Sequence, residues 1–197
     1  GVQDEGSQLV ALALADAPLE GEDGRWLDLC AGPGGKAALL AGLAAERGAH
    51  LVANEVAPHR AELVRRSLAG MPGEPEVTVA DGRDGPWEPG SFDRVLLDAP
   101  CTGLGALRRR PEARWRRTAG DLDTLVSLQR ALLASALRLV RPGGVVLYAT
   151  CSPVLAETRE VVAACVEPSD VVLELTEQLW PHRDGTDAMF SALLRRG

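Results

Sequence analysis

Two apolar segments that each lead to a cysteine constrain the fold of this chain more than any other feature. In residues 92–105, an apolar run is followed by Asp98 and Cys101; in residues 145–153, a second run leads to Cys151. Each pattern predicts a buried strand that ends in a proline-bounded polar turn. Ligands bind at the carboxyl edge of the strands in open α/β sheets. We therefore expect Asp98 and the two cysteines to meet at a site of chemistry.

The rest of the chain alternates between expected strands and expected helices. Strands are predicted over residues 25–30, 50–55, 76–80, 92–98, 145–150, 171–175 and 190–194. Helices are predicted over residues 5–15, 36–47, 58–69, 121–140 and 157–166, the fourth with Leu122, Leu125, Leu128, Leu132 and Leu139 as candidate core residues. This alternation indicates an α/β fold with a mostly parallel sheet, right-handed crossovers and helices on both faces. The strand ends would bring five side chains to one edge, namely Cys30, Glu55, Asp81, Asp98 and Cys151.

Length and composition narrow the class of protein. The chain has 197 residues, which fits one domain over residues 1–197 with a real core. No apolar run is long enough to span a membrane, and the first residues lack a signal peptide pattern, so we expect a cytoplasmic protein with reduced thiols. The four cysteines form no C-x-x-C motif and the histidines are isolated, so no metal site is expected.

The charge distribution allows one local contact with nucleic acid. The net charge is −7, which argues against nucleic-acid binding over the whole surface. Residues 107–117, however, hold six arginines against a single acid, beside Trp115. This basic segment is either a solvated helix end or an RNA-binding patch, and its candidates are Arg108, Arg109, Arg110, Arg114, Arg116 and Arg117.

A glycine-rich turn follows the first expected strand. Residues 32–37 have the pattern G-x-G-x-x-A, and Glu55 follows about 20 residues later, where an acid can bind ribose hydroxyls. The pattern alone fits a dinucleotide, S-adenosylmethionine, or a turn that only packs a helix on a strand. Additional acids at Asp81 and Asp98 favour S-adenosylmethionine, because its sulfonium and ammonium groups are positive, whereas a pyrophosphate would be repelled. Lys36, at the helix start, is the only lysine of the chain.

The two strand-end cysteines fit a particular reaction. A thiolate that adds to carbon 6 of cytosine makes carbon 5 nucleophilic toward a sulfonium methyl group, and loss of the carbon-5 proton then releases the cysteine. The reaction needs a nucleophilic cysteine, an acid that reaches N3 and a group that assists release. Cys151, Asp98 and Cys101 could fill these roles, whereas Cys30 and Cys165 are more typical of small buried residues.

The chain resembles the RNA cytosine-5 methyltransferases of the Sun/Fmu (RsmB) and NSUN family, and most closely the bacterial 16S rRNA enzymes. The resemblance extends over nearly the whole chain, in residues 3–8, 27–36, 81–83, 97–103, 109–112, Gln129 and 148–152. It implies a Rossmann-like class I fold with a seven-stranded sheet and S-adenosylmethionine as cofactor. It also implies that Cys151 is the nucleophile, that Cys101 assists product release, and that Asp98 and Lys36 hold or protonate the flipped base. The implied cofactor-binding residues are Cys30, Ala31, Gly32, Pro33, Gly34, Gly35, Lys36, Glu55, Arg60, Asp81 and Asp98.

The chain departs from the family pattern in a few places. Ala37 stands where the family usually has Thr, Gly32 where Ala is common, and Glu55 where Asp is frequent, while residues 187–190 replace the usual Gly-Phe-Phe. The family's N-terminal RNA-binding domain is expected to lie outside these 197 residues. We expect a monomer that acts on small-subunit rRNA. The alternatives are cytosine methylation of a tRNA or DNA, an NAD-binding oxidoreductase, and a non-catalytic RNA-binding domain.

Overall fold

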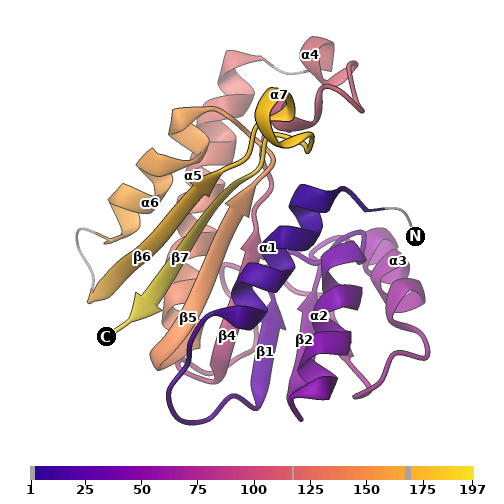
Figure 1. The fold of residues 1–197 in the computed structure, drawn as a ribbon, viewed down its shortest axis with the longest axis vertical. Helices are drawn as coiled ribbons and strands as arrows, with labels where there is room; N and C mark the ends of the chain where they lie inside the picture. The colour runs from indigo at the N-terminus through magenta and orange to yellow at the C-terminus, as the bar shows by residue number, and fades with distance from the viewer. Residues whose placement is uncertain (1–2, 117, 167–169) are drawn as a thin grey trace.

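A computed structural model describes residues 3–116, 118–166 and 170–197. Its centre is a seven-stranded sheet in the order β3-β2-β1-β4-β5-β7-β6, in which both pairings of β7 are antiparallel and all others are parallel (Figure 1). This confirms the predicted α/β class and mostly parallel sheet. The strands are β1 (Arg25–Asp28), β2 (His50–Asn54), β3 (Glu76–Thr78), β4 (Phe92–Asp98), β5 (Val140–Thr150), β6 (Val171–Gln178) and β7 (Phe190–Arg196).

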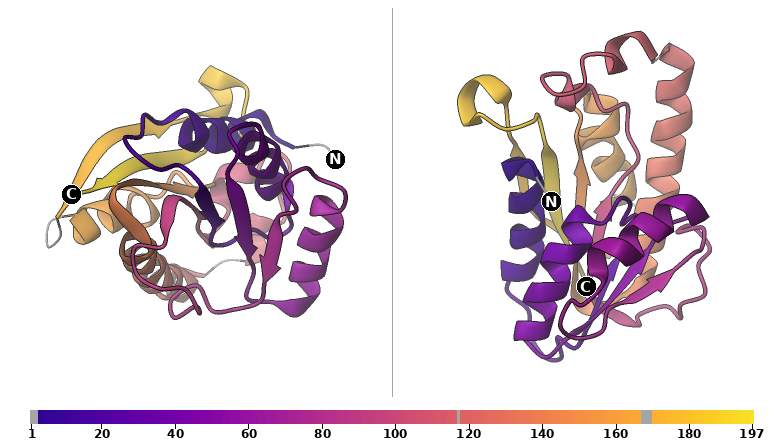
Figure 2. Two further views of the ribbon diagram at one scale, coloured as in Figure 1. Left: turned by 90° about the horizontal axis from the view of Figure 1, so that it is seen from below. Right: turned by 90° about the vertical axis from the view of Figure 1, so that its right-hand side faces the viewer.

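Helices cover both faces of the sheet, as predicted (Figure 2). Alternate residues of each strand face opposite sides, so Leu96 packs with α1 and α2, whereas Val95 and Leu97 pack with α5 and α6. Two separate apolar cores result. The helices are α1 (Glu5–Asp16), α2 (Gly35–Glu46), α3 (Pro58–Leu68), α4 (Ala113–Arg116), α5 (Ala119–Leu139), α6 (Arg159–Val166) and α7 (Pro181–Asp184).

Local sequence signals account for several boundaries. Pro58 begins α3, where its fixed φ suits the first helical turn. Thr118 and Asp121 form a reciprocal capping box at the start of α5. At the amino end of β4, the buried Arg94 donates hydrogen bonds to the carbonyl oxygens of Leu14 and Ala17, both 2.7 Å away, which satisfies the end of α1. These contacts fix α1 against the centre of the sheet.

The structure corrects parts of the expected boundaries. The predicted helix over residues 157–166 is split into a 3₁₀ turn, Leu155–Glu157, and α6. β5 begins at Val140, with a bulge through the expected turn before Val145. α7, which the pattern did not predict, precedes β7.

The core prediction for α5 is only partly right. Leu132 and Leu139 are buried, but Leu122, Leu125 and Leu128 are only half-buried. The early turns of this long helix extend past the carboxyl edge of the sheet (Figure 2), so no strand covers them. In the later turns of α5, the buried side chains also include Leu133, Ala136 and Leu137.

No helix in the described part of the chain is long and apolar enough to cross a membrane.

Candidate active site

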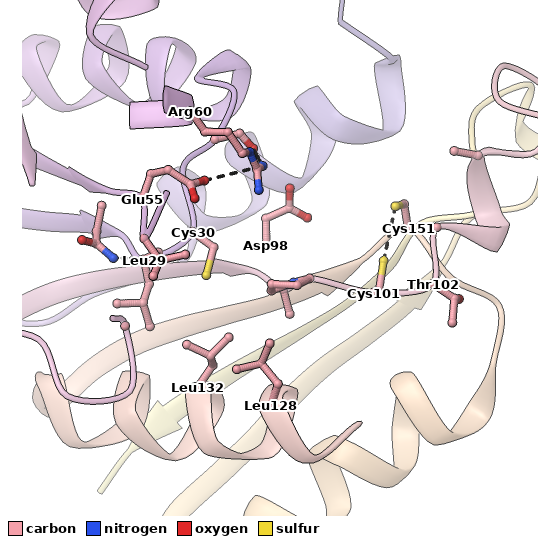
Figure 3. Close-up of a pocket in the computed structure, with 18 of the residues that line it drawn as sticks. Leu29, Cys30, Glu55, Arg60, Asp98, Cys101, Thr102, Leu128, Leu132 and Cys151 are labelled. Carbon is pink, nitrogen blue, oxygen red and sulfur yellow. Dashed lines mark hydrogen bonds and ion pairs between the residues drawn. The ribbon is translucent and has the colours of Figure 1, made fainter. Parts of the chain in front are cut away.

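A cavity of about 640 Å³ opens at the carboxyl edge of β1, β2 and β4 (Figure 3). The sheet order places these strand ends side by side, which is where a doubly wound fold binds its ligands. Among the predicted site residues, the cavity wall includes Cys30, Gly32, Glu55, Arg60, Asp81, Asp98, Cys101 and Cys151. Its opposite side is apolar and comes largely from Leu29, Leu128 and Leu132. One wall therefore carries the polar groups and the other is apolar.

The glycine turn is tight because α3 lies directly against it. Gly34 has a φ of +112°, and an added Cβ would lie 2.7 Å from Ser67. Ser67 Oγ in turn donates to the carbonyl of Pro33 at 3.3 Å. Glycine is thus required at position 34 for both conformation and space. The other predicted cofactor-binding residues of this segment do not line the cavity, namely Ala31, Pro33, Gly34, Gly35 and Lys36.

The side chain of Glu55 occupies the space beside Gly32. Glu55 is buried, accepts a hydrogen bond from the amide of Ala57 at 3.0 Å, and lies 3.5 Å from Nη2 of Arg60. Arg60 Nη2 also donates to the Gly32 carbonyl at 2.7 Å. A Cβ on Gly32 would lie only 2.1 Å from Oε2 of Glu55. Glycine at 32 and glutamate at 55 are therefore geometrically matched.

Asp81 both caps its own turn and faces the cavity. Its carboxylate accepts hydrogen bonds from the Arg83 side chain and from the Arg83 amide, the latter at 3.0 Å. These bonds lower the pKa of Asp81 to about 2. Asp81 can thus close its turn, as the Asp-Gly sequence favours, and also take part in the site.

The side chains of Cys101 and Cys151 meet, with their sulfur atoms 3.4 Å apart. The hydrogen bond from Cys101 lowers the pKa of Cys151, and the nearby ammonium of Lys36 acts in the same direction against burial and the charge of Asp98. The hydrogen bond to Cys151, together with burial, raises the pKa of Cys101 well above its usual range. We infer that Cys151 is the thiolate of the pair and that Cys101 is its thiol donor.

The other two cysteines differ from this pair. Burial and the charge of Asp28 raise the pKa of Cys30 far above that of an ordinary thiol. Cys165 lies away from the cavity, and burial raises its pKa as well. Neither environment favours a thiolate.

Lys36 reaches the site as the partner of Asp98. Its Nζ lies 2.7 Å from Asp98 Oδ2, and its side chain is only 12% exposed. Burial alone would lower the pKa of Lys36, but the charge and hydrogen bond of Asp98 outweigh it and raise that pKa. Lys36 is therefore a charged ammonium beside the two thiols.

Two buried acids near the site were missed by the sequence interpretation. Asp28, at the end of β1, has its pKa raised to about 7 by burial and by the charge of Asp98. Glu157 is fully buried and accepts a hydrogen bond from the Thr102 amide, next to Cys101. The Leu-Asp-Leu-Cys run hinted at Asp28, but no local signal marks Glu157.

The structure divides the predicted arginine patch. Asp187, which is buried, accepts hydrogen bonds from Arg108 Nε at 2.8 Å and from Arg109 Nε at 2.9 Å, and both arginines also approach Asp4. These two arginines hold the start of α1 against the turn before β7, so their charge is largely compensated.

The remaining part of the patch is open to solvent. Arg110 lines the cavity, Arg114 is exposed, and Trp115 is 83% exposed. The side chain of Arg116 and the whole of Arg117, also predicted to bind RNA, lie outside the described residues. An exposed indole beside cations is suited to stacking on an unpaired base.

Within the described residues, no group of three or more metal-ligating side chains is found.

Comparison with known proteins identifies relatives along almost the entire chain. A family model described as 16S rRNA methyltransferase RsmB/F matches residues 13–195. A Mycobacterium tuberculosis protein that carries the provisional name of a methyltransferase is 59% identical over 213 residues, which cover 99% of this chain and 46% of that protein. The ribosomal RNA small subunit methyltransferase B of Sodalis glossinidius is 40% identical over 178 residues, which cover 89% of this chain and 40% of that protein. The chain thus spans less than half the length of these curated relatives.

A solved structure supports the same relationship. NSun6 from Pyrococcus horikoshii, crystallised with the S-adenosylmethionine analogue SFG, superposes with a TM-score of 0.83 at 26% identity. The match covers 98% of this chain and 52% of that one. The resemblance inferred from the motifs is thereby confirmed, as is the class I methyltransferase fold.

Proposed function

The chain belongs to the RsmB/F family of 16S rRNA methyltransferases, and we propose that it methylates carbon 5 of a cytosine in RNA, with 16S rRNA as the substrate. The observation that carries the proposal is the contact between Cys101 and Cys151, at 3.4 Å, beside the ion pair of Lys36 and Asp98. A methyltransferase that acts on an oxygen or an exocyclic nitrogen has no need of a thiol pair. The proposal places the reaction in the cytoplasm, where bacterial rRNA methyltransferases act.

S-adenosylmethionine is the cofactor of this fold family, and the cavity fits it. The matched pair of Gly32 and Glu55 leaves a carboxylate beside the turn, suited to ribose hydroxyls. The apolar wall of Leu128 and Leu132 suits the adenine ring. Asp98 faces the cavity as an anion that favours the positively charged methionine end. When bound, S-adenosylmethionine supplies the electrophilic methyl group.

We assign the nucleophilic step to Cys151. Its thiolate adds to carbon 6 of the cytosine while N3 takes up a proton, so that carbon 5 becomes enamine-like and can accept the methyl group. Lys36 is the group of the ion pair that carries a proton, so we assign it the donation toward N3, directly or through water. Asp98 is an acceptor and is suited to the exocyclic amino group. After methylation, the carbon-5 proton passes to water, the bond between carbon 6 and Cys151 breaks with its electron pair returning to the sulfur, and the N3 proton returns to Lys36. We assign assistance of that release to Cys101.

The substrate base must be turned out of its stack, because carbon 6 is inaccessible in a helix. Arg110, Arg114 and Trp115 lie where they could hold the flanking strand. A small cationic surface of this kind supplies modest affinity. We propose that the segments present in the longer relatives contribute the rest, as the expected RNA-binding domain would.

A covalent trap tests the proposal. Cys101→Ala protein is incubated with S-adenosylmethionine and small-subunit rRNA, and an RNA–protein adduct resistant to SDS is sought. We expect an adduct that disappears in the double variant with Cys151→Ala, because elimination is blocked only after Cys151 has added. The same assay with tRNA distinguishes the two RNA classes. The absence of an adduct while the protein binds both S-adenosylmethionine and the RNA, or an adduct that persists without Cys151, would contradict the proposal.

A further inference from the structure

The cysteine pair is supported from behind by a buried polar cluster that the reaction above does not use. We propose that Glu157 is a positioning residue: its buried carboxylate holds the turns that carry Cys101 and Cys151 together and gives the two thiols unequal roles. This inference rests on the proposed function, since it assigns Cys151 and Cys101 the parts of nucleophile and donor.

The hydrogen bonds of Glu157 join the residues that directly follow each cysteine. Oε1 accepts from the Thr102 amide at 2.7 Å, and Oε2 accepts from the Thr102 hydroxyl at 2.5 Å and the Ser152 hydroxyl at 2.6 Å. Thr102 follows Cys101 and Ser152 follows Cys151. One side chain therefore fixes the separation of the two sulfur atoms.

A fourth donor extends the cluster to α5. Gln129, which is fully buried, donates to Glu157 Oε1 at 3.1 Å and to the carbonyl of Pro100 at 2.8 Å. Tyr148 donates from its hydroxyl to the Glu157 carbonyl at 2.7 Å, which ties the 3₁₀ turn to β5. With two bonds accepted at each carboxylate oxygen, Glu157 is held as an acceptor-only group. Such a network is far more costly to leave half-satisfied than to complete.

The charge of Glu157 also separates the two thiols chemically. The charged and titratable groups around Cys101 are Cys151, Glu157 and Asp98, and all three raise its pKa. Around Cys151 are Cys101 and Lys36, which lower its pKa, and Asp98, which raises it; Arg109 also lies within electrostatic range of Cys151. The Glu157 carboxylate raises the pKa of Cys101 and so favours the thiol form there, whereas the Lys36 ammonium lowers the pKa of Cys151 and favours the anion.

Two variants separate geometry from charge. Glu157→Gln keeps the size and an acceptor oxygen, and its amide can donate to the hydroxyls of Thr102 and Ser152, so the turns stay joined while the charge is lost. Glu157→Ala removes both. The matched control is Glu160→Gln, which replaces a carboxylate by a carboxamide at an exposed residue three positions away.

The effect of the Glu157 charge is measured by the rate at which each cysteine is alkylated, followed separately for Cys101 and Cys151 over a range of pH. We expect the profile of Cys101 to shift to lower pH in Glu157→Gln and to remain in place in Glu160→Gln. An unshifted Cys101 profile in Glu157→Gln would overturn the electrostatic part. Because a purely structural residue would not move this profile in an isosteric variant, the shift distinguishes the two roles.

The rate at which diamide closes a Cys101–Cys151 disulfide measures the geometry. We expect Glu157→Gln to form the disulfide at the wild-type rate. In Glu157→Ala the rate should fall by an order of magnitude or more, because the effective concentration of one thiol at the other falls when the turns are no longer held together. If Glu157→Ala does not bind S-adenosylmethionine and so is not folded, the double variant Thr102→Val with Ser152→Ala replaces it. Closure at the wild-type rate in either would overturn the positioning role. None of these readouts uses RNA, so a failure of methyl transfer to any RNA refutes the proposed function separately.

Discussion

Substitution of Gly32 by alanine tests whether the polar wall of the cavity is built as described. An added Cβ would lie 2.1 Å from Oε2 and would force the Glu55 carboxylate to move by more than an ångström. Glu55 is only 3% exposed and accepts a hydrogen bond from the Ala57 amide, so a shift of its carboxylate toward the cavity would break that bond. The family pattern commonly has alanine at position 32 and frequently has the shorter aspartate at position 55, so the same two positions supply the variants for the test.

The magnitude follows from what Glu55 must give up. A hydrogen bond to a charged group contributes about 1.5–3 kcal/mol, and overpacking of a filled site costs about 1–3 kcal/mol. We therefore expect Gly32→Ala to weaken S-adenosylmethionine binding by about 2 kcal/mol, which is roughly thirtyfold in Kd. The double variant with Glu55→Asp should recover to within about threefold of Glu55→Asp alone, because the removed methylene clears the Cβ; the coupling energy is then about 2 kcal/mol.

The double-mutant cycle is measured by calorimetric titration of S-adenosylmethionine into the wild type, both single variants and the double variant. Gly24→Ala is the matched control, since a Cβ there meets nothing within 4 Å. Additive single effects, with no recovery in the double variant, would show that Gly32 and Glu55 are not in contact in the protein. A wild-type Kd for Gly32→Ala would refute the steric argument altogether.

Three further perturbations probe separate parts of the site. Lys36→Met removes a charge that lowers the pKa of Cys151, so iodoacetamide labelling of Cys151 should shift to higher pH; an unchanged profile would contradict the electrostatic role. For Asp28, the folded pKa of about 7 exceeds the ordinary 3.8, so the folded state binds this proton more tightly and stability falls as pH rises between these values. Between pH 5 and pH 8 that loss is about 3 kcal/mol. Asp28→Asn should remove it in urea unfolding at these two pH values, and parallel pH dependences of variant and wild type would refute it. Arg110→Ala should weaken RNA binding and reduce its salt dependence by about one charge, whereas Arg108→Ala, already paired, should change the salt slope less; equal slopes in filter binding would argue against this division.

The sheet and the meeting of the two cysteines could be predicted because the information is local. Each strand is a short apolar run closed by a polar residue, and parallel strands end at the same edge, so the strand ends alone brought Asp98, Cys101 and Cys151 together. The pairing of Asp98 with Ala149 across β4 and β5 gives the reason. Cys101 lies three residues beyond Asp98 and Cys151 two beyond Ala149, so the two thiols leave the sheet at nearly the same depth.

What the sequence concealed depends on contacts between distant segments. Arg108 and Arg109 resembled a free basic patch because their partners, Asp4 and Asp187, are 183 residues apart and converge only in the fold. Glu157 resembled an ordinary first-turn helix acid, whereas the turn it closes ends before α6 begins. In both cases charge composition alone could not tell a solvated group from a compensated one.

The two faces of the sheet make the thiol pair asymmetric. Lys36 comes from α2, on the face that carries α1 and α3, whereas Glu157 is bonded to Gln129 of α5, on the opposite face. A cation therefore reaches Cys151 from one side and an anion supports Cys101 from the other. The hydrogen bond between the two thiols is the largest cause of their opposite pKa shifts, and the charges on the two faces of the sheet act in the same direction. In the proposed mechanism, these flanking charges add to the difference between the nucleophile and its donor, so removal of either charge should reduce the separation of the two pKa values.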